Sequence, residues 1–197
     1  MRIGLYGGTF DPPHNAHLEL AEWVRQELDL DYIYFIPAAI HAIKNNNTLS
    51  PAVIRNEMLQ EAIKKNDKFK LSRIELERHN ISFTIDTLRQ FLDYEKMAQA
   101  TIFYLIGYDN LVEFHLWKSY RSILKICQVV VLQRSGEIDS EIIKKYGDDV
   151  LFLDSPCINI SATEIRKKIS RGVDVSDSVP APVLEIIRKH GLYKNDT

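Results

Sequence analysis

The strongest constraint on the fold of this chain is a glycine-rich stretch between an expected strand and an expected helix. Residues 2–6 contain two aliphatic residues at alternate positions and predict a buried strand. The apolar spacing from residue 18 to residue 28 predicts an amphipathic helix. Between them lies the sequence GGTFDPPHNAH, residues 7–17. Gly7 and Gly8 have no β-carbon, so the backbone can turn sharply there and bring its N–H groups close to a phosphate.

Two histidines of this stretch are expected near the start of the helix. If the helix begins near Asn15, His17 projects from its first turn and His14 lies just before it. The positive end of the helix dipole then points toward the same place, so both histidines could face a bound phosphate. Two other roles stay open from the residues alone, since histidines in this position can also cap a helix or bind a metal ion.

The rest of the chain alternates expected strands and helices. Residues 32–37 are β-branched and aromatic and predict a second buried strand, which completes a strand–helix–strand unit. Further strands are expected at residues 70–74, 101–106, 127–132 and 150–153. We therefore expect an α/β fold, a Rossmann-like doubly wound parallel sheet with helices on both faces, in a single domain that spans residues 1–197. Such sheets bind their ligands at the carboxyl ends of the strands.

Charge and composition exclude several classes of protein. The chain has 25 basic and 27 acidic side chains and a net charge of −2. It therefore lacks the overall excess of positive charge that indicates a nucleic-acid partner. The sequence contains no run of about 18 apolar residues and no export signal, so we expect no membrane partner. Cys127 and Cys157 fit a reducing compartment better than a disulfide framework. We therefore expect a cytoplasmic protein with small-molecule partners.

A second polar segment, near the end of the chain, also predicts phosphate binding. In residues 159–166, NISATEIR, Ser161 and Glu164 have the spacing of a capping box and predict a helix start. Thr163 and Arg166 fall in the same first turn, where a hydroxyl, backbone N–H groups and a guanidinium could converge on a polyphosphate.

Other candidate residues are expected where strands end or helices begin. Ser82 or Thr84 can cap a helix, and Gly107 and Asp109 follow the strand at residues 101–106. A carboxylate at that edge can accept hydrogen bonds from ribose hydroxyls.

Four further side chains are candidates, and for Lys44, Trp117 and Arg55 a role without ligand contact stays open beside the functional one. Lys44 lies in a polar loop after the second strand, and Arg134 leaves the strand at residues 127–132 on the same edge of the sheet. Trp117 offers a flat surface to an aromatic ligand, but tryptophans are also often core residues. Arg55, in the helix expected from Pro51 onward, is predicted to lie on the helix surface.

The two polar segments resemble motifs of the nucleotidylyltransferase superfamily, whose members transfer a nucleoside monophosphate from a triphosphate. Residues 7–17 resemble G-G-[ST]-F-D-P-x-H-x-G-H, with Ala16 in place of the usual glycine, and ISATEIR resembles I-S-[SA]-T-x-I-R, which holds the triphosphate. The resemblance implies that His14, His17 and Arg166 are catalytic. It also implies an ATP site formed by Gly7, Gly8, Thr9, Phe10, His14, His17, Ser161, Thr163 and Arg166.

Within this superfamily, the chain resembles the bacterial nicotinate-nucleotide adenylyltransferases nearly from end to end. Residues 82–88, SFTIDTL, resemble S-[YF]-T-x-D-T-L, where backbone N–H groups at a helix start receive the pyridine carboxylate. Tyr108 departs from the usual G-A-D phrase, and residues 41–43 depart from the usual P-P-H before a phosphate-contacting lysine. The resemblance implies a nicotinate-nucleotide site formed by Lys44, Phe83, Thr84, Gly107, Asp109, Trp117 and Arg134, with Trp117 stacked on the pyridine ring.

These resemblances imply adenylyl transfer from ATP to nicotinate mononucleotide, giving nicotinate adenine dinucleotide and pyrophosphate in NAD biosynthesis. No protein nucleophile is expected, and Mg²⁺ is expected to be carried on the ATP phosphates rather than held by a protein metal site. The helices at residues 161–193 are expected to complete the ATP site. A homo-oligomer stays open, as does the choice between the acid and the amide of the pyridine substrate.

Two other functions stay open from the sequence. One is another small-substrate nucleotidylyltransferase, such as the pantetheine-phosphate or cytidylyl type, although those chains are usually shorter and lack the set formed by Thr84, Asp109 and Trp117. The other is a non-catalytic nucleotide sensor of the same fold, motivated by the altered loop at residues 41–44 and by Tyr108. Release of pyrophosphate separates an enzyme from a sensor.

Overall fold

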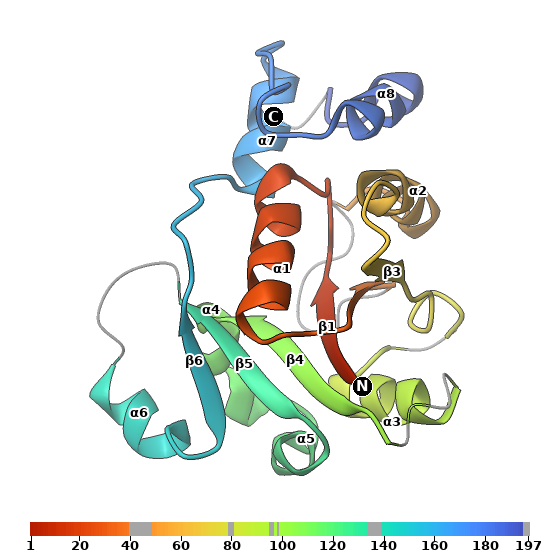
Figure 1. Cartoon of the computed structure of the whole chain (residues 1–197). Coiled ribbons are helices and arrows are strands. Elements are labelled where there is room, and N and C mark those ends of the chain that lie inside the picture. The colour runs from red at the N-terminus through yellow and green to blue at the C-terminus, as the bar shows by residue number, and fades with distance from the viewer. Residues whose placement is uncertain (40–48, 79–80, 95–96, 98, 134–138, 195–197) are drawn as a thin grey trace.

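The computed structural model describes residues 1–39, 49–78, 81–94, 97, 99–133 and 139–194 (Figure 1). Lys44, Arg134 and the altered segment 41–43 lie outside these described residues.

Six parallel strands of the described chain form one sheet, in the spatial order β3-β2-β1-β4-β5-β6. They are β1 (Arg2–Gly8), β2 (Tyr32–Pro37), β3 (Phe69–Leu71), β4 (Thr101–Gly107), β5 (Gln128–Gln133) and β6 (Val150–Asp154). The chain moves outward from β1 through β2 and β3 and then in the other direction through β4, β5 and β6. The strand order therefore reverses between β1 and β4, which is where doubly wound sheets bind their ligands. The predicted fold class is confirmed.

Helices cover both faces of the sheet and extend beyond its carboxyl edge (Figure 1). They are α1 (Asn15–Glu27), α2 (Ala52–Ile63), α3 (Thr84–Tyr94), α4 (Tyr108–Val112), the short 3₁₀ helix η2 (Phe114–Leu116), α5 (Tyr120–Ile126), α6 (Ser140–Tyr146), α7 (Ala162–Ser170) and α8 (Ala181–His190). The start of α1 at Asn15 is where the sequence predicts it. Gly191, with a φ of 60°, is the C-cap of α8.

Helices bury both faces of the sheet. Because successive residues of a strand point to opposite sides, the side chains of one strand enter two different cores. In β4, Ile102, Tyr104 and Ile106 belong to the core formed with α3, α4 and α5. Phe103 and Leu105 belong to the core formed with α1 and α2. This two-sided burial explains why the central strands read as continuous apolar runs.

A third core holds the last two helices against α2. Its buried members come from α2, α7, α8 and the segments that flank α8: Met58, Ile165, Val175, Val179, Val183, Leu184, Ile186, Ile187 and Tyr193. Figure 1 shows α7 and α8 beyond the carboxyl edge of the sheet, with α8 beside α2. At the start of α1, the N–H and the side-chain amide of Asn15 donate to the carbonyls of Ser178 and Asp177, each at 2.9 Å. The C-terminal helices are therefore fixed to the segment that follows the glycine-rich loop.

Several predicted boundaries differ from the structure. The first strand continues through Gly7 and Gly8, which pair with β2, so the sharp turn predicted at these glycines is wrong and the chain turns after them. The third strand covers Phe69–Leu71 rather than residues 70–74, because Ile74 turns into the core and is only 5% exposed. Pro51 is the N-cap of α2 rather than its first helical residue, since its ψ of 136° is extended.

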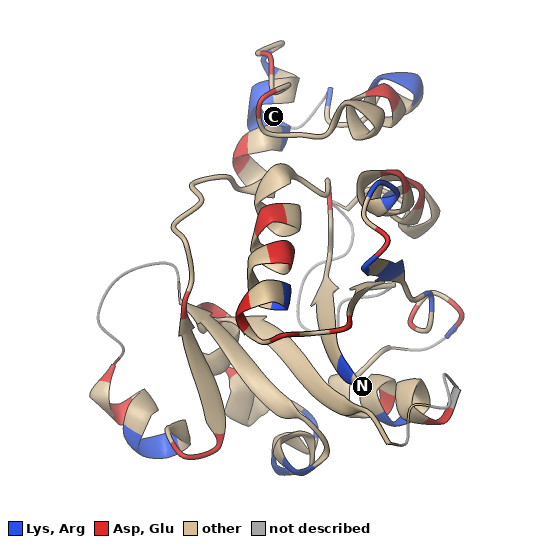
Figure 2. Ribbon diagram, viewed as in Figure 1, with Lys and Arg blue, Asp and Glu red and all other residues tan. Residues whose placement is uncertain are grey.

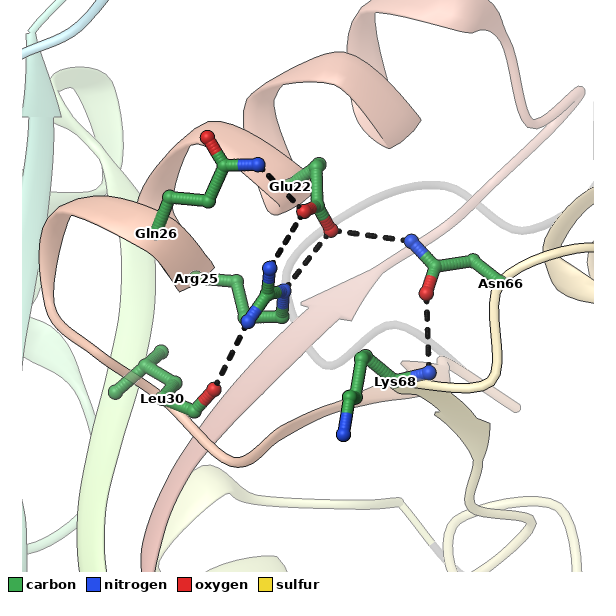
Figure 3. Close-up of polar contacts among 6 residues, drawn as sticks. All are labelled: Glu22, Arg25, Gln26, Leu30, Asn66 and Lys68. Atoms are coloured by element: carbon green, nitrogen blue, oxygen red, sulfur yellow. Dashed lines mark hydrogen bonds and ion pairs between the residues drawn. The ribbon is translucent and has the colours of Figure 1, made fainter.

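A polar network connects α1 to the turn before β3 (Figure 3). Glu22 accepts hydrogen bonds from Arg25 at 2.7 and 3.0 Å, from Gln26 at 2.8 Å and from Asn66 at 3.1 Å. Asn66 also accepts from the N–H of Lys68 at 3.0 Å. Together the hydrogen bonds that Glu22 accepts lower the pKa of Glu22 to about 2, and the bond with Arg25 makes the largest contribution to that shift. The first helix is thereby joined to the β2–β3 side of the sheet.

Charged side chains of both signs are spread over the helices, and β4 and β5 carry none (Figure 2). Among the helices of the described residues, none is both long enough and apolar enough to cross a membrane.

Candidate active site

A cleft of about 840 Å³ lies at the carboxyl ends of β1 and β4. The loop after β1 and the first turns of α1, α3, α4 and α7 border it. Every predicted site residue in the described part of the chain lines this cleft: Gly7, Gly8, Thr9, Phe10, His14, His17, Phe83, Thr84, Gly107, Asp109, Trp117, Ser161, Thr163 and Arg166. Its volume is in the range of small-molecule sites. Lys44 and Arg134 stay predictions, because they lie outside the described ranges.

The two glycines at the end of β1 are required by their neighbours. A β-carbon on Gly7 would lie 2.9 Å from the hydroxyl oxygen of Tyr104, and one on Gly8 would lie 2.9 Å from the Phe10 ring. Phe10 is 2% exposed and has a φ of 49°, so the chain turns in the left-handed region just after the glycines. Because neither glycine carries a side chain, the backbone of the loop itself forms part of the cleft wall.

The two histidines form a stacked pair at the start of α1. His14 is the N-cap residue and is 3% exposed, and its ring stacks on that of His17 with centroids 3.6 Å apart. The backbone N–H of His14 donates to Nδ1 of His17 at 3.2 Å. A neutral His17 that accepts at Nδ1 carries its proton on Nε2, so that nitrogen is its hydrogen-bond donor. The ring edge of His17 also packs against Phe10, with centroids 5.0 Å apart.

The segments near the two ends of the chain meet in this cleft. Arg166 donates from Nη1 to the backbone carbonyl of Asp11 at 2.8 Å and from Nη2 to Thr163 Oγ1 at 3.5 Å. Ser161 is the N-cap of α7, and its hydroxyl accepts from the N–H of Glu164 at 3.2 Å. The helix start predicted from the capping pattern is therefore present, and it faces the glycine-rich loop across one cavity.

The start of α3 lines another part of the cleft. Thr84 is its first residue, and its hydroxyl lies 3.5 Å from that of Tyr104 in the middle of β4. Burial, reinforced by the nearby Glu75, raises the pKa of Tyr104 above its usual value, so the hydroxyl stays protonated. The cleft therefore contains two neutral hydroxyl groups beside the first turn of a helix.

Aromatic rings form the adjoining wall. Trp117 lies between η2 and α5, and it packs against Tyr104 and Phe114 with centroid distances of 6.4 and 5.2 Å. The ammonium of Lys118 lies 4.6 Å from the ring centroid of Phe83 and pairs with Asp86 at 2.8 Å. Trp117 thus packs against the core and also lines the cleft, and its stacking on a ligand ring stays a prediction.

The segment after β4 forms the rim. Gly107 is the N-cap of α4, and Asp109 lies in the first turn with its side chain exposed. Tyr108, the departure from the family pattern, lines the cleft, and its hydroxyl accepts from the N–H of Asp139 at 3.1 Å. The bulky Tyr108 side chain therefore connects this rim to the N-cap residue of α6.

Arg55 lies in the interior, and its predicted position on the helix surface is wrong. It is 2% exposed and donates to the carbonyls of Thr9, Ser50 and Ala39 at 2.7, 3.0 and 3.4 Å. Burial lowers the pKa of its guanidinium, and the charge of Asp11 opposes that shift. A signal was present in the sequence, since Arg55 precedes the buried Met58 and Leu59 of α2 by three and four positions.

Glu75 is a further cleft residue to which the sequence gives no role. Its carboxyl accepts from the hydroxyl of Thr87 at 2.8 Å, and burial raises its pKa. No group of three or more histidine, cysteine, aspartate or glutamate residues within the described ranges is arranged to hold a metal ion.

Comparison with known proteins agrees with this geometry. The sequence profile of the cytidylyltransferase-like family matches residues 5–168. A probable nicotinate-nucleotide adenylyltransferase of Clostridium acetobutylicum is 37% identical, over 96% of this chain and 97% of the relative. A protein of the same description from Exiguobacterium sibiricum is 36% identical, over 98% of this chain and 99% of the relative.

The fold is shared with a solved structure. Nicotinic acid mononucleotide adenylyltransferase of Plasmodium falciparum, in complex with NaAD, superimposes with a TM-score of 0.79 over 98% of this chain and 97% of that one, at 22% identity. The profile match and the near full-length relatives identify the family. The chain belongs to the cytidylyltransferase-like family and, within it, to the nicotinate-nucleotide adenylyltransferases.

Proposed function

We propose that this chain transfers the adenylyl group of ATP to nicotinate mononucleotide, which gives nicotinate adenine dinucleotide and pyrophosphate and is a step of NAD biosynthesis. The observation that carries the proposal is the shared cleft, in which the 7–17 and 161–166 segments lie on either side of one cavity. The curated relatives are named for this activity, and the Plasmodium protein was solved in complex with NaAD.

The reaction needs positioning more than covalent chemistry by the protein. An oxygen of the mononucleotide 5′-phosphate forms a bond to the α-phosphorus of ATP, and the bond between that phosphorus and the oxygen bridging to the β-phosphate breaks. The attacking oxygen is already anionic, so no protein base is required. The protein's task is to align the two phosphates and to balance their negative charge.

The triphosphate is assigned to the cleft wall built from both ends of the chain. Gly7, Gly8, Thr9 and Phe10 supply backbone to one side, and Ser161, Thr163 and Arg166 supply the first turn of α7 to the other. A helix start and a guanidinium both favour bound phosphate. His14 and His17 adjoin the same wall, and His17 can donate from Nε2 to the reacting phosphate.

Mg²⁺ enters this proposal on the ATP phosphates. The ion would neutralise phosphate charge, and it needs few protein ligands because it retains several of its water molecules. Arg166 and His17 would add positive charge or hydrogen-bond donors around the same phosphates.

The mononucleotide is assigned to the wall formed by Phe83, Thr84, Gly107, Asp109 and Trp117, with Lys44 and Arg134 retained as predicted contacts. The first turn of α3 favours the pyridine carboxylate over a neutral carboxamide by about 0.3–1 kcal/mol at an exposed site, and by more when buried. Asp109 at the rim can accept from ribose hydroxyls, and Trp117 can stack on the ring. We therefore propose the nicotinate form as the preferred substrate.

Pyrophosphate release tests the proposed function. The purified protein is given ATP and Mg²⁺ with nicotinate mononucleotide, nicotinamide mononucleotide or phosphopantetheine in separate reactions. We expect release with nicotinate mononucleotide and several-fold less with its amide. Release with phosphopantetheine alone would assign the chain to the pantetheine-phosphate type, and nucleotide binding without release would identify a sensor.

A further inference from the structure

The buried residue Asp11 joins three segments that are far apart in the sequence. Its Oδ1 accepts from the hydroxyl of Tyr193 at 2.5 Å, and its Oδ2 accepts from the backbone N–H of Ser50 at 3.1 Å. Its backbone carbonyl accepts from Arg166 at 2.8 Å. Asp11 is 2% exposed, so these bonds form away from bulk water, where they are stronger. One residue of the glycine-rich loop therefore holds the C-terminal segment, the approach to α2 and the first turn of α7.

Arg55 supplies the opposite charge in this interior region. Its guanidinium donates to the carbonyls of Thr9 and Ser50, one of which belongs to the same loop as Asp11. The negative charge of Asp11 favours the charged state of Arg55, which burial alone disfavours. Arg55 therefore holds the loop at Thr9, and Tyr193 holds it at Asp11.

Tyr193 connects this loop to the third core. Its ring is 8% exposed and packs in the cluster that contains Ile165 of α7 and Val183 of α8. Burial and the adjacent Asp11 carboxylate raise the pKa of the Tyr193 hydroxyl, so the group donates a proton to the hydrogen bond at neutral pH. The ring of Tyr193 therefore packs with the C-terminal helices, and its hydroxyl is hydrogen-bonded to the cleft loop.

We propose that Tyr193 is a positioning residue for the triphosphate, acting through Asp11. By holding Asp11 in place, it fixes the loop carbonyl that receives Arg166 and sets the distance between the glycine-rich loop and the first turn of α7. This inference rests on the proposed function, because it assigns the triphosphate to the space between those two walls. On the pyridine side of the cleft, Thr84 of α3 and Tyr104 of β4 pair with each other, and no described residue of these two elements is hydrogen-bonded to the Tyr193 hydroxyl.

The test is the substitution Tyr193→Phe, which removes the hydroxyl and keeps the ring in the core. Steady-state kinetics are measured with ATP and with nicotinate mononucleotide varied in turn. We expect the KM for ATP to rise about tenfold, as for the loss of one hydrogen bond to a charged group. The KM for nicotinate mononucleotide should change less than twofold. Equal increases in both constants, or no increase in the KM for ATP, would overturn the proposal.

Tyr146→Phe is the matched control. Tyr146 of α6 is also a buried tyrosine, at 2% exposed, and its hydroxyl has no hydrogen-bond partner among the described residues. Both KM values should stay at the wild-type level in this variant. A rise in the KM for ATP there as large as that in Tyr193→Phe would assign the effect to general loosening of the fold and contradict the positioning role.

A double-mutant cycle separates action through Asp11 from an independent effect. Asp11→Asn should itself raise the KM for ATP, and Tyr193→Phe added to it should raise the constant less than twofold further. Fully multiplicative effects would refute action through Asp11. These outcomes are distinct from failure of the proposed function, in which the wild-type protein itself releases no pyrophosphate.

Discussion

The histidine pair shows how a side chain in this cleft acquires a defined hydrogen-bonding role. The backbone N–H of His14 occupies Nδ1 of His17, and the stacked ring of His14 supports the orientation of His17. A neutral His17 therefore presents an Nε2–H donor, and protonation would require the Nδ1 contact to be broken. This arrangement favours hydrogen-bond donation to a phosphate over exchange of a proton with it.

Replacing His17 with alanine should lower kcat by about 10²–10³, the usual effect of removing one donor to transition-state charge. The melting temperature should change by only a few degrees, because most of the α1 packing comes from Leu20, Ala21 and Val24. His190→Ala serves as the control, since that histidine lies at the end of α8 with Nε2 3.7 Å from Glu57. Turnover of His17→Ala at the His190→Ala rate would show that His17 has no such role.

Arg55 is a residue whose loss should reduce stability. Arg55→Met fills a similar volume but leaves the carbonyls of Thr9 and Ser50 without their donor and Asp11 without its balancing charge. We expect the free energy of unfolding to fall by about 3 kcal/mol. Urea denaturation measures this loss.

Arg73→Met is the comparison for that measurement, because Arg73 is exposed and donates to Gln60 at 2.8 Å. Its effect should be below about 1 kcal/mol. Equal effects of the two substitutions would contradict the structural account of Arg55.

The contacts of single residues were only partly predictable from the sequence. Local patterns found Ser161, because a capping residue is recognised by its neighbours within one turn. The contacts of Arg55 and Tyr193 depend on where distant segments fold, with partners 46 and 182 positions away. No local periodicity contains that information.

At the level of elements, the network of Glu22 in Figure 3 makes the attachment of α1 sensitive to pH. Contact with Arg25 lowers the folded-state pKa of Glu22 to about 2 from an ordinary 4.5. A group with a lowered folded pKa adds stability that is fully present above its unfolded pKa and is lost as the pH falls through the folded pKa. The contribution of Glu22 should therefore disappear between about pH 4.5 and pH 2.

Glu22→Gln should lower the free energy of unfolding by about 1 kcal/mol at pH 6, a figure that is discounted because the carboxylate is partly exposed. The difference from wild type should shrink steadily toward pH 3 in urea titrations. Glu19→Gln, an exposed change on the same helix, should have an effect close to zero at both pH values. A Glu22→Gln difference that does not depend on pH would contradict the network's role.

Strong periodicity made most elements predictable, and irregular segments were the exception. Apolar residues identified β1, β2, β4 and β5, the helical spacing after the glycine-rich stretch indicated a start of α1 near Asn15, and a capping pattern identified the start of α7. The end of β3 was predicted wrongly because Ile74 is buried outside the sheet. In the sequence, a buried isoleucine just after a strand cannot be told from a residue of the strand. Hydrophobic spacing reports burial, and it does not say whether the burying partner is a neighbouring strand or a helix.

At the scale of the whole molecule, strand order and the third core together create the site. The parallel sheet brings the carboxyl ends of β1 and β4 together at the switch point, and the third core places α7 over that edge. The predicted meeting of the two motif segments needed both features. Neither follows from the motifs alone, because each motif is consistent with a helix start anywhere in the fold.

A crystal structure of the protein with a non-hydrolysable ATP analogue, Mg²⁺ and nicotinate mononucleotide would test most directly whether both ends of the chain bind one triphosphate. We expect the phosphates to lie between the backbone of Gly8 and Thr9 and the first turn of α7, with His17 and Arg166 about 3 Å from phosphate oxygens. A triphosphate that contacts only one of these segments, or that binds outside the cleft, would contradict the account.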